Sequence, residues 1–193
     1  MANADTPFGL RPVRYVSGAP YNGAVNRYFM PSTDSNGPNY VGQLVKPAGS
    51  ADGDGVMTVS GNVTTGDAVL GPIVSVEPVT RESPVYRADD TARYVFVADD
   101  PGLLFEVQDD AAATPTAAIV GNVADLTGLT SGSTTTGQSA TEISMASISA
   151  AGDGTEDVII VGLAQRPDNA IGNNAKWLVR LNNHFFTDAS AGA

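Results

Sequence analysis

Cysteine is absent from this 193-residue chain, and histidine occurs once, at His184. Without cysteine there is no disulfide framework, no thiolate metal site and no cysteine nucleophile. A single histidine also leaves little scope for imidazole ligation or for acid–base chemistry, and His184 is expected at a surface or an interface. We therefore expect no cofactor and no bound metal.

Long apolar runs are also missing: nowhere do 18 apolar residues follow one another, and MANADTPFGLRPVRY at the start lacks the pattern of a secretory signal. We expect synthesis in a cytoplasm and no membrane partner. Positive charge is scarce, since 10 Lys and Arg stand against 21 Asp and Glu, for a net charge of −11. Phosphate contacts need clustered Lys and Arg, so this charge argues against a nucleic-acid partner.

Helix-compatible stretches are few, because 21 Gly and 12 Pro are spread along the chain. The apolar runs between them are short and alternating or β-branched, which predicts an all-β fold, either a barrel or a sandwich. Only residues 109–120 offer a helical window, and Pro115 interrupts it. Strands are expected at 56–60, 68–79, 93–98, 103–108, 141–149, 157–164 and 175–183.

Two of these expected strands have informative faces. Trp177, Val179 and Leu181 alternate with Lys176 and Arg180, as in a strand buried on one side. The run VIIVGL at 158–163 is apolar on both faces and belongs in the middle of a sheet or under a neighbouring subunit.

Residues 1–40 differ from the rest of the chain. They carry three Arg and two Asp, a net charge of +1, which leaves −12 for residues 41–193, and they hold six of the twelve Phe and Tyr residues. This aromatic load indicates an extended arm that lies on a surface, either its own body or a partner. Residues 41–193 are expected to form one β-rich domain with a polar loop at about 127–140, because twelve of residues 127–149 are Ser or Thr.

Carboxylates concentrate at residues 99–110, which hold Asp99, Asp100, Glu106, Asp109 and Asp110. Paired carboxylates catalyse glycoside hydrolysis, so an enzyme is one alternative. However, the sequence Asp-Asp-Pro-Gly at 99–102 is typical of a turn, and a solvated loop of about four residues between two strands is the favoured interpretation. A cation-binding loop at these residues is a further alternative.

The sequence ADGDGVMTVSGN at 51–62 begins like a calcium-binding loop with Asp52 and Asp54. Val56 and Val63 then stand where two ligands are required, so a polar turn is favoured. No phosphate-binding glycine loop or nucleophile elbow is present, and we expect a non-catalytic protein.

Three stretches resemble a known family: TPFGLRPVRYVSGAPYNGAVNRYFM at 6–30, YVFVADDPGLLFEVQ at 94–108 and VGLAQRPDNAIGNNAKWLVRLNNHFF at 161–186. They are similar to decoration, or cement, proteins that coat the capsids of tailed bacteriophages. The resemblance implies a β-barrel or β-sandwich, a place on the outer surface of the virion, the major capsid protein as partner, and a homotrimer. The Ser/Thr-rich loop has no counterpart in the family pattern.

A capsid role would use the arm, because aromatic and Arg side chains dominate interface energetics. The candidate partner-binding residues are Phe8, Arg11, Arg14, Tyr15, Tyr21, Arg27, Tyr28 and Phe29. The same arm can instead fold back on its own barrel and complete a sheet. The alternative function is a tail, fibre or neck β-module that binds a receptor carbohydrate through its Ser/Thr/Asn loops.

Overall fold

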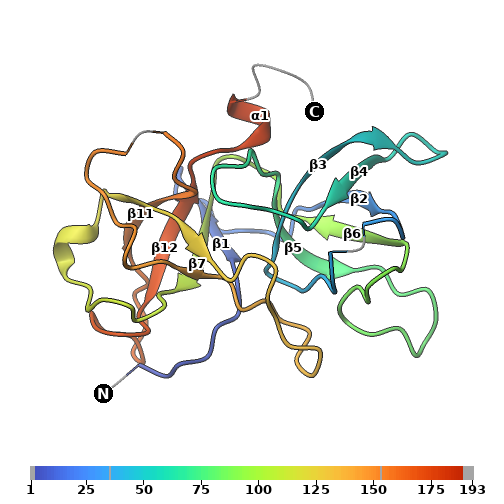
Figure 1. Cartoon of the computed structure of the whole chain (residues 1–193). Helices are drawn as coiled ribbons and strands as arrows, with labels where there is room; N and C mark the ends of the chain where they lie inside the picture. Colours follow the sequence, from blue (N-terminus) through green and yellow to red (C-terminus); the bar gives the residue numbers. More distant parts are fainter. Residues whose placement is uncertain (1–2, 35, 153, 189–193) are drawn as a thin grey trace.

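The computed structural model describes residues 3–34, 36–152 and 154–188, and it confirms the all-β prediction. Two layers of structure lie side by side, a closed barrel and an open sheet (Figure 1). Around the barrel run β2 (Asn26–Met30), β4 (Met57–Ser60), β3 (Leu44–Ala51), β5 (Gly71–Val76) and β6 (Arg93–Val97). Across the sheet run β1 (Arg11–Tyr15), β7 (Leu103–Gln108), β12 (Lys176–Leu181), β11 (Val158–Leu163) and β8 (Val123–Ala124).

The remaining elements are short. β9 (Leu126–Thr127) pairs with β10 (Glu142–Ile143) beside the sheet. A single 3-10 turn, η1 (Ala117–Ile119), lies inside the window where helix was conceivable. A four-residue helix, α1 (Phe185–Asp188), follows β12. We call the open sheet with β8–β10 and η1 the sheet lobe, and the five-stranded ring the barrel.

The chain builds the sheet lobe from both of its ends. β1 pairs with β7, whereas the barrel comprises residues 26–97 and is thus inserted between these two paired strands. β2 pairs with β6 over Asn26–Met30, so it belongs to the barrel. The segment 1–40 is therefore not an arm set apart from the body: its two strands complete one sheet each, and residue 40 is not a structural boundary.

Each lobe has its own apolar core. In the sheet lobe Trp177, Val179 and Leu181 are buried beside Phe105 of β7, which confirms the alternation seen in the sequence. In the barrel the core gathers Tyr28, Met30, Val45, Val59, Leu70, Ile73, Val95 and Val97. Burial of an apolar side chain of this size stabilises a fold by about 1.5–3 kcal/mol, so both lobes have a substantial apolar driving force.

The Asp-Asp-Pro-Gly stretch does not form a hairpin. β6 belongs to the barrel and β7 to the sheet, so residues 98–102 carry the chain from one lobe to the other. Asp100 behaves as expected and accepts a hydrogen bond from the Gly102 N–H at 2.7 Å. Asp99, expected in a solvated loop, is buried, because its carboxylate accepts from Asn26 Nδ2 and from the Tyr28 hydroxyl.

His184 is buried at the end of β12 rather than exposed at a surface. Its Nδ1 accepts from the Phe186 N–H at 3.2 Å, and its backbone bridges to Val69, which lies just before β5 of the barrel. The histidine is therefore part of the packing between the lobes.

Two glycines let the N-terminal segment lie against the barrel. Gly9 has φ 71° and Gly42 has φ 87°, and the Leu10 N–H donates to the Gly42 carbonyl at 2.9 Å. A Cβ on Gly42 would lie 2.4 Å from the Phe8 carbonyl oxygen, which is closer than any real contact allows. The position of residues 8–10 therefore depends on glycine at 42.

Candidate functional site

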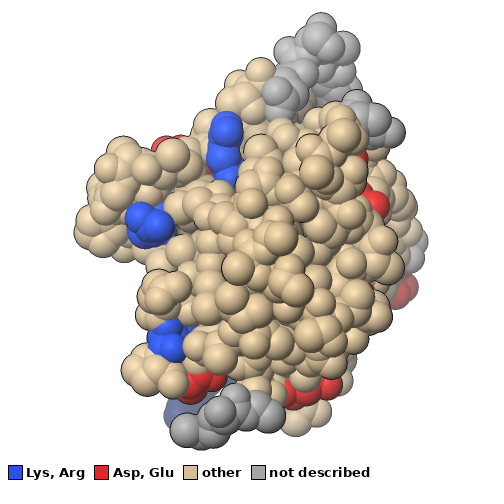
Figure 2. All heavy atoms as spheres, turned by 90° about the vertical axis from the view of Figure 1, so that its left-hand side faces the viewer, with Lys and Arg blue, Asp and Glu red and all other residues tan. Residues whose placement is uncertain are grey.

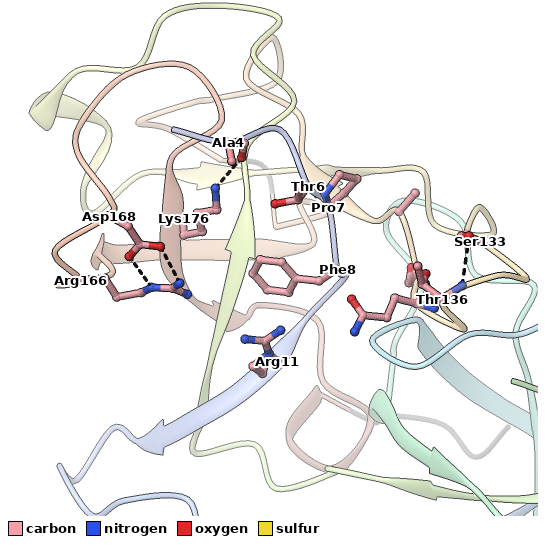
Figure 3. Close-up of a pocket in the computed structure, with 14 residues that line it drawn as sticks. Ala4, Thr6, Pro7, Phe8, Arg11, Ser133, Thr136, Arg166, Asp168 and Lys176 are labelled. Atoms are coloured by element: carbon pink, nitrogen blue, oxygen red, sulfur yellow. Dashed lines mark hydrogen bonds and ion pairs between the residues drawn. The ribbon is translucent and has the colours of Figure 1, made fainter. Parts of the chain in front are cut away.

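A groove of about 760 Å³ opens where the N-terminal segment crosses the sheet lobe (Figure 3). Residues from 4–11 line it together with residues from 132–140 on one wall and from 166–176 on the other. Its volume lies in the range of about 300–1,000 Å³ that is typical of ligand sites. We refer to it as the groove.

The floor of the groove is formed by residues 4–11, whose first part is held by two hydrogen bonds to the sheet lobe. Pro7 disfavours helix at Thr6, and the Thr6 N–H donates to Gln108 Oε1 at 3.1 Å. Before it, Lys176 Nζ donates to the Ala4 carbonyl at 2.7 Å. This bond satisfies one of the donors of the Lys176 ammonium group. Lys176 is buried, although the alternation in the sequence predicts it on the outer face of its strand.

One wall is the Ser/Thr-rich hairpin, which the sequence predicted as a polar loop. Ser133 N–H donates to the Gln138 carbonyl at 2.9 Å, and Gly137 N–H donates to the Ser133 carbonyl at 2.7 Å. Ser133, Thr136 and Gln138 are exposed along this wall. The wall therefore presents hydroxyl and amide groups but no charge.

The opposite wall carries an ion-pair cluster. Arg166 donates to Glu106 Oε1 at 2.6 Å and to Asp168 Oδ2 at 2.9 Å, so its charge is met by two carboxylates. The hydrogen bond from the Arg166 guanidinium lowers the pKa of Asp168 below its ordinary value. Figure 3 shows Arg166 and Asp168 across the floor from the Ser133 and Thr136 hairpin.

Arg11 is the groove cation that is both exposed and, among the described residues, without an ion pair. Its guanidinium lies 4.5 Å from the centre of the Phe8 ring, and it makes no ion pair with any residue in the described part of the chain. Arg11 is exposed. With Arg166 and Lys176, it brings three of the ten Lys and Arg residues of a −11 chain to one groove.

The eight predicted partner-binding residues fall into two groups. Phe8 and Arg11 lie in the groove, and Arg14 is exposed on β1, while Tyr15 and Tyr21 are half-buried against the sheet core. This first group lies along β1, whose outer edge is partly covered because Tyr15 N–H donates to the Ala19 carbonyl at 2.8 Å. Five predicted residues thus share one region.

Arg27, Tyr28 and Phe29 form the second group and lie in the barrel. Arg27 binds Glu77 at 2.7 Å and its guanidinium stacks 3.3 Å from the centre of the Tyr94 ring. The Phe29 ring contacts the same tyrosine, and Tyr28 is buried. These contacts are internal to the barrel, so the structure does not bring these three residues to the groove.

The other carboxylates of the acidic stretch are also occupied. Asp109 is fully buried and accepts from Trp177 Nε1 at 3.0 Å and from the N–H groups of Asn174 and Ala175. It holds the turn before β12 in place. Asp52, at the calcium-like start, accepts from Val56 N–H at 2.8 Å and from the Tyr94 hydroxyl at 2.6 Å, as a polar turn does. Among the described residues, no three His, Asp or Glu side chains form a group that could hold a metal ion.

A second surface is notable for its lack of charge. Residues 111–165 include five Asp and Glu and no Lys or Arg. The face toward which η1 and β11 lie is largely uncharged, and charged side chains gather at its rim (Figure 2). We call the exposed residues of 112–121, 146–152 and 159–162 the neutral face; Val120 and Val161 are more than two-fifths exposed on it.

The sequence indicated one part of the groove better than the other. The aromatic and Arg content of the N-terminal segment predicted the binding residues on the floor. Nothing in the sequence singled out Ser133, Thr136 and Gln138 beyond a polar, Ser/Thr-rich composition. Arg166 and Lys176 lie in the third stretch that carries the family resemblance, yet no pattern there pointed to a site.

Comparisons with protein-family models, with curated proteins and with solved structures found no match to this chain. No helix within the described ranges is long and apolar enough to cross a membrane.

Proposed function

We propose that this protein is a non-catalytic structural protein of a phage virion, which binds the outer surface of the capsid and bridges neighbouring capsomers against the pressure of packed DNA. The major capsid protein is its proposed partner. One observation carries the proposal: the three stretches that resemble decoration proteins, although far apart in sequence, meet at the groove. Phe8 and Arg11 come from the first and Arg166 and Lys176 from the third. From the second, Glu106 and Gln108 accept hydrogen bonds from the groove residues Arg166 and Thr6.

The distribution of charge supports a role at a surface. The acidic remainder of the chain favours solubility and repels DNA, while the groove offers the exposed cation that an acidic shell surface would attract. Like-charged copies repel least where charge is lowest, so the neutral face is the proposed contact between copies in a homotrimer. A stable interface buries about 1,200–2,000 Å² in total.

The test is to add purified full-length protein to capsids that lack it and to measure the bound fraction by sedimentation and electron microscopy. A deletion of residues 1–30 is unsuitable because it removes β1 and β2 from both sheets. We expect Arg11→Glu to reduce binding about tenfold or more, because it reverses the free charge in the groove. Arg81→Glu, the same change in an exposed residue between β5 and β6, is the matched control and should bind normally.

A receptor-carbohydrate module is the second candidate function. The uncharged hydroxyl and amide groups of Ser133, Thr136 and Gln138 beside the Phe8 ring favour it, since sugar sites combine such groups with an aromatic surface. Binding of the wild-type protein to a host surface glycan, together with failure to bind capsids, would favour this candidate over the capsid role.

A further inference from the structure

A smaller pocket adjoins the groove at the junction of the two lobes. The groove and this pocket share Phe8, Arg11 and Gln138 among their lining residues, so the two are contiguous. The pocket has a volume of about 230 Å³. We call it the side pocket. The apolar and aromatic side chains that line the rest of it come from both lobes: Leu10, Pro12, Tyr21, Val41, Ile73 and Val74.

The walls of the side pocket are held by hydrogen bonds between segments that are distant in sequence. The Leu10 N–H donates to the Gly42 carbonyl at 2.9 Å, and the Gly42 N–H donates to the Ile73 carbonyl at 2.7 Å. Tyr21 is tied to β1, because its N–H donates to the Val13 carbonyl at 3.1 Å. These bonds fix the walls within the chain, so the pocket is preformed and little ordering is required when a group enters it.

The lining keeps apolar surface in contact with water. Four of its side chains are half-buried rather than buried: Pro12, Tyr21, Val41 and Val74. Val74 belongs to β5 of the barrel but packs against the core of the sheet lobe, so the pocket lies between the two cores. Protein interiors are close-packed, and an apolar group that filled this space would remove apolar surface from water on several sides.

The volume favours a side chain over a complete small-molecule ligand. Pockets for small molecules usually measure about 300–1,000 Å³, and the side pocket is smaller than this range. One large apolar side chain, such as Leu, Met or Phe, is the better match. Apolar anchors of this kind, seated in a pocket and surrounded by a polar rim, carry much of the binding energy of protein interfaces.

The rim of the side pocket indicates the charge of the partner. Arg11 is exposed there and makes no ion pair within the described ranges, and no described Asp or Glu lines the pocket. The Gln138 side chain is also exposed, and its amide makes no hydrogen bond to the described chain. A carboxylate next to the anchoring side chain would therefore meet a cation and an amide donor at the rim.

We infer that the side pocket takes one large apolar side chain of the major capsid protein, and that a carboxylate beside this side chain pairs with Arg11. This inference rests on the proposed function and names the anchoring point of the contact. Because the side pocket is contiguous with the groove, a single segment of the capsid protein can occupy both.

The first experiment tests the side pocket without capsids. N-acetylphenylalanine, N-acetylphenylalaninamide and N-acetylalanine are titrated into the full-length protein, and methyl signals are followed by NMR. We expect N-acetylphenylalanine to shift the methyl signals of Leu10, Val41, Ile73 and Val74. It should bind more than about tenfold more tightly than N-acetylalanine, because its larger side chain loses more contact with water. The amide should bind about two- to fivefold more weakly, and Arg11→Ala should abolish that difference, since an exposed ion pair contributes little.

The second experiment fills the side pocket with a side chain of the protein itself. Val74→Trp places an indole ring in it, and Val79→Trp, the same change at an exposed position just after β5, is the matched control. Val41→Phe fills the pocket from another segment and replaces Val74→Trp if that variant does not fold, as judged by circular dichroism and urea denaturation. We expect the filled variant to lose N-acetylphenylalanine binding and to bind capsids at least about tenfold more weakly. Val79→Trp should retain both.

The outcomes separate this inference from the proposed function. If the wild-type protein does not bind capsids, the proposed function is wrong and the inference fails with it. If the wild type binds capsids and a folded, filled variant binds them equally well, only the inference is wrong. Unchanged methyl signals in N-acetylphenylalanine would also overturn it, whatever the capsids show. If filling the pocket abolishes self-association in analytical ultracentrifugation and leaves capsid binding intact, a second copy is the occupant and the inference is wrong.

Discussion

The barrel and the sheet lobe differ in how their strand edges are treated: the barrel closes them and the sheet lobe leaves them open. The barrel is made from one continuous segment, 26–97, and its five strands close into a ring that has no free edge. The sheet lobe is made from both ends of the chain and keeps the edge strands β1 and β8. Closure removes sites for further pairing, whereas an open sheet retains them. Both surfaces that we propose for binding, the groove and the neutral face, accordingly lie on the sheet lobe.

Both lobes bury charged side chains that are held by hydrogen bonds. The barrel end buries a cation: Arg87 is fully buried and donates to Asn39 Oδ1 at 2.7 Å and to the Pro31 carbonyl at 2.8 Å. The sheet lobe buries an anion, Asp109, whose oxygens accept from Trp177 and from backbone N–H groups. In each lobe a long-range polar network fixes segments that hydrophobic burial alone would leave free to shift.

The largest effect is expected from Trp177→Ala. It removes the largest fully buried side chain of the sheet lobe and should lower the free energy of unfolding by about 3–5 kcal/mol. Urea denaturation followed by far-UV circular dichroism measures the loss, and hydrogen exchange shows where it occurs. Because the barrel is inserted between β1 and β7, we expect both lobes to lose protection together.

Two controls accompany that variant. Phe186→Ala, about half exposed after β12, should change stability by no more than about 0.5 kcal/mol. Met30→Ala is the corresponding deletion in the core of the barrel, and it tests whether the sheet lobe loses protection when the barrel is weakened. If the barrel keeps its full protection when Trp177 is lost, the lobes fold independently and the proposed coupling through the inserted segment is wrong.

A smaller loss is expected from Arg87→Met. The change keeps much of the side-chain volume but leaves Asn39 Oδ1, the Pro31 carbonyl and the Thr91 carbonyl without their donor, and it removes the cation 3.9 Å from Asp34. The cost should be about 3 kcal/mol, because buried acceptors lose their partners. Arg81→Met, an exposed residue of the same loop, is the control. Equal denaturation midpoints for both variants would show that the buried network contributes little.

The smallest effects concern pH, and here carboxyls with raised and with lowered pKa values should differ in sign. Burial raises the pKa of Asp157 and of Glu142 in the sheet lobe, while the Tyr94 hydroxyl lowers the pKa of Asp52 and Arg27 lowers the pKa of Glu77 in the barrel. The raised groups stabilise the fold most below their ordinary pKa, and that contribution is lost as pH rises through the folded value. The lowered groups stabilise it above their ordinary pKa and lose that contribution as pH falls.

Carbon-13 NMR titration of the side-chain carboxyls measures these values directly. Tyr94→Phe should bring the pKa of Asp52 back toward its ordinary value and leave Asp157 unchanged. If Asp157 became protonated only at a lower pH than an exposed aspartate, the argument that burial raises its pKa would be wrong. The order of protonation on acidification should therefore be Asp157 and Glu142 first, and Asp52 and Glu77 later.

Local sequence predicted the strands that repeat a clear pattern. The runs expected at 93–98, 103–108, 157–164 and 175–183 appear as β6, β7, β11 and β12, since alternation and β-branching act over a few neighbouring residues. Sequence patterns do not predict strands at β1, β2 and β3, because their Pro and Gly content resembles that of loops. Their strand conformation comes from partners distant in sequence, such as β7 for β1.

Composition and short-range periodicity are enough to establish the all-β class, the acidic charge, the buried face of the Trp177 strand and the absence of thiol chemistry, because they are properties of the chain alone. Tertiary structure decided that the barrel is inserted between β1 and β7, and that Asp99 and Asp109 are buried. It also decided that Phe8 and Arg11 meet Ser133 and Arg166 in one groove. Pairing between strands about a hundred residues apart leaves no local pattern, so only the folded chain reveals it.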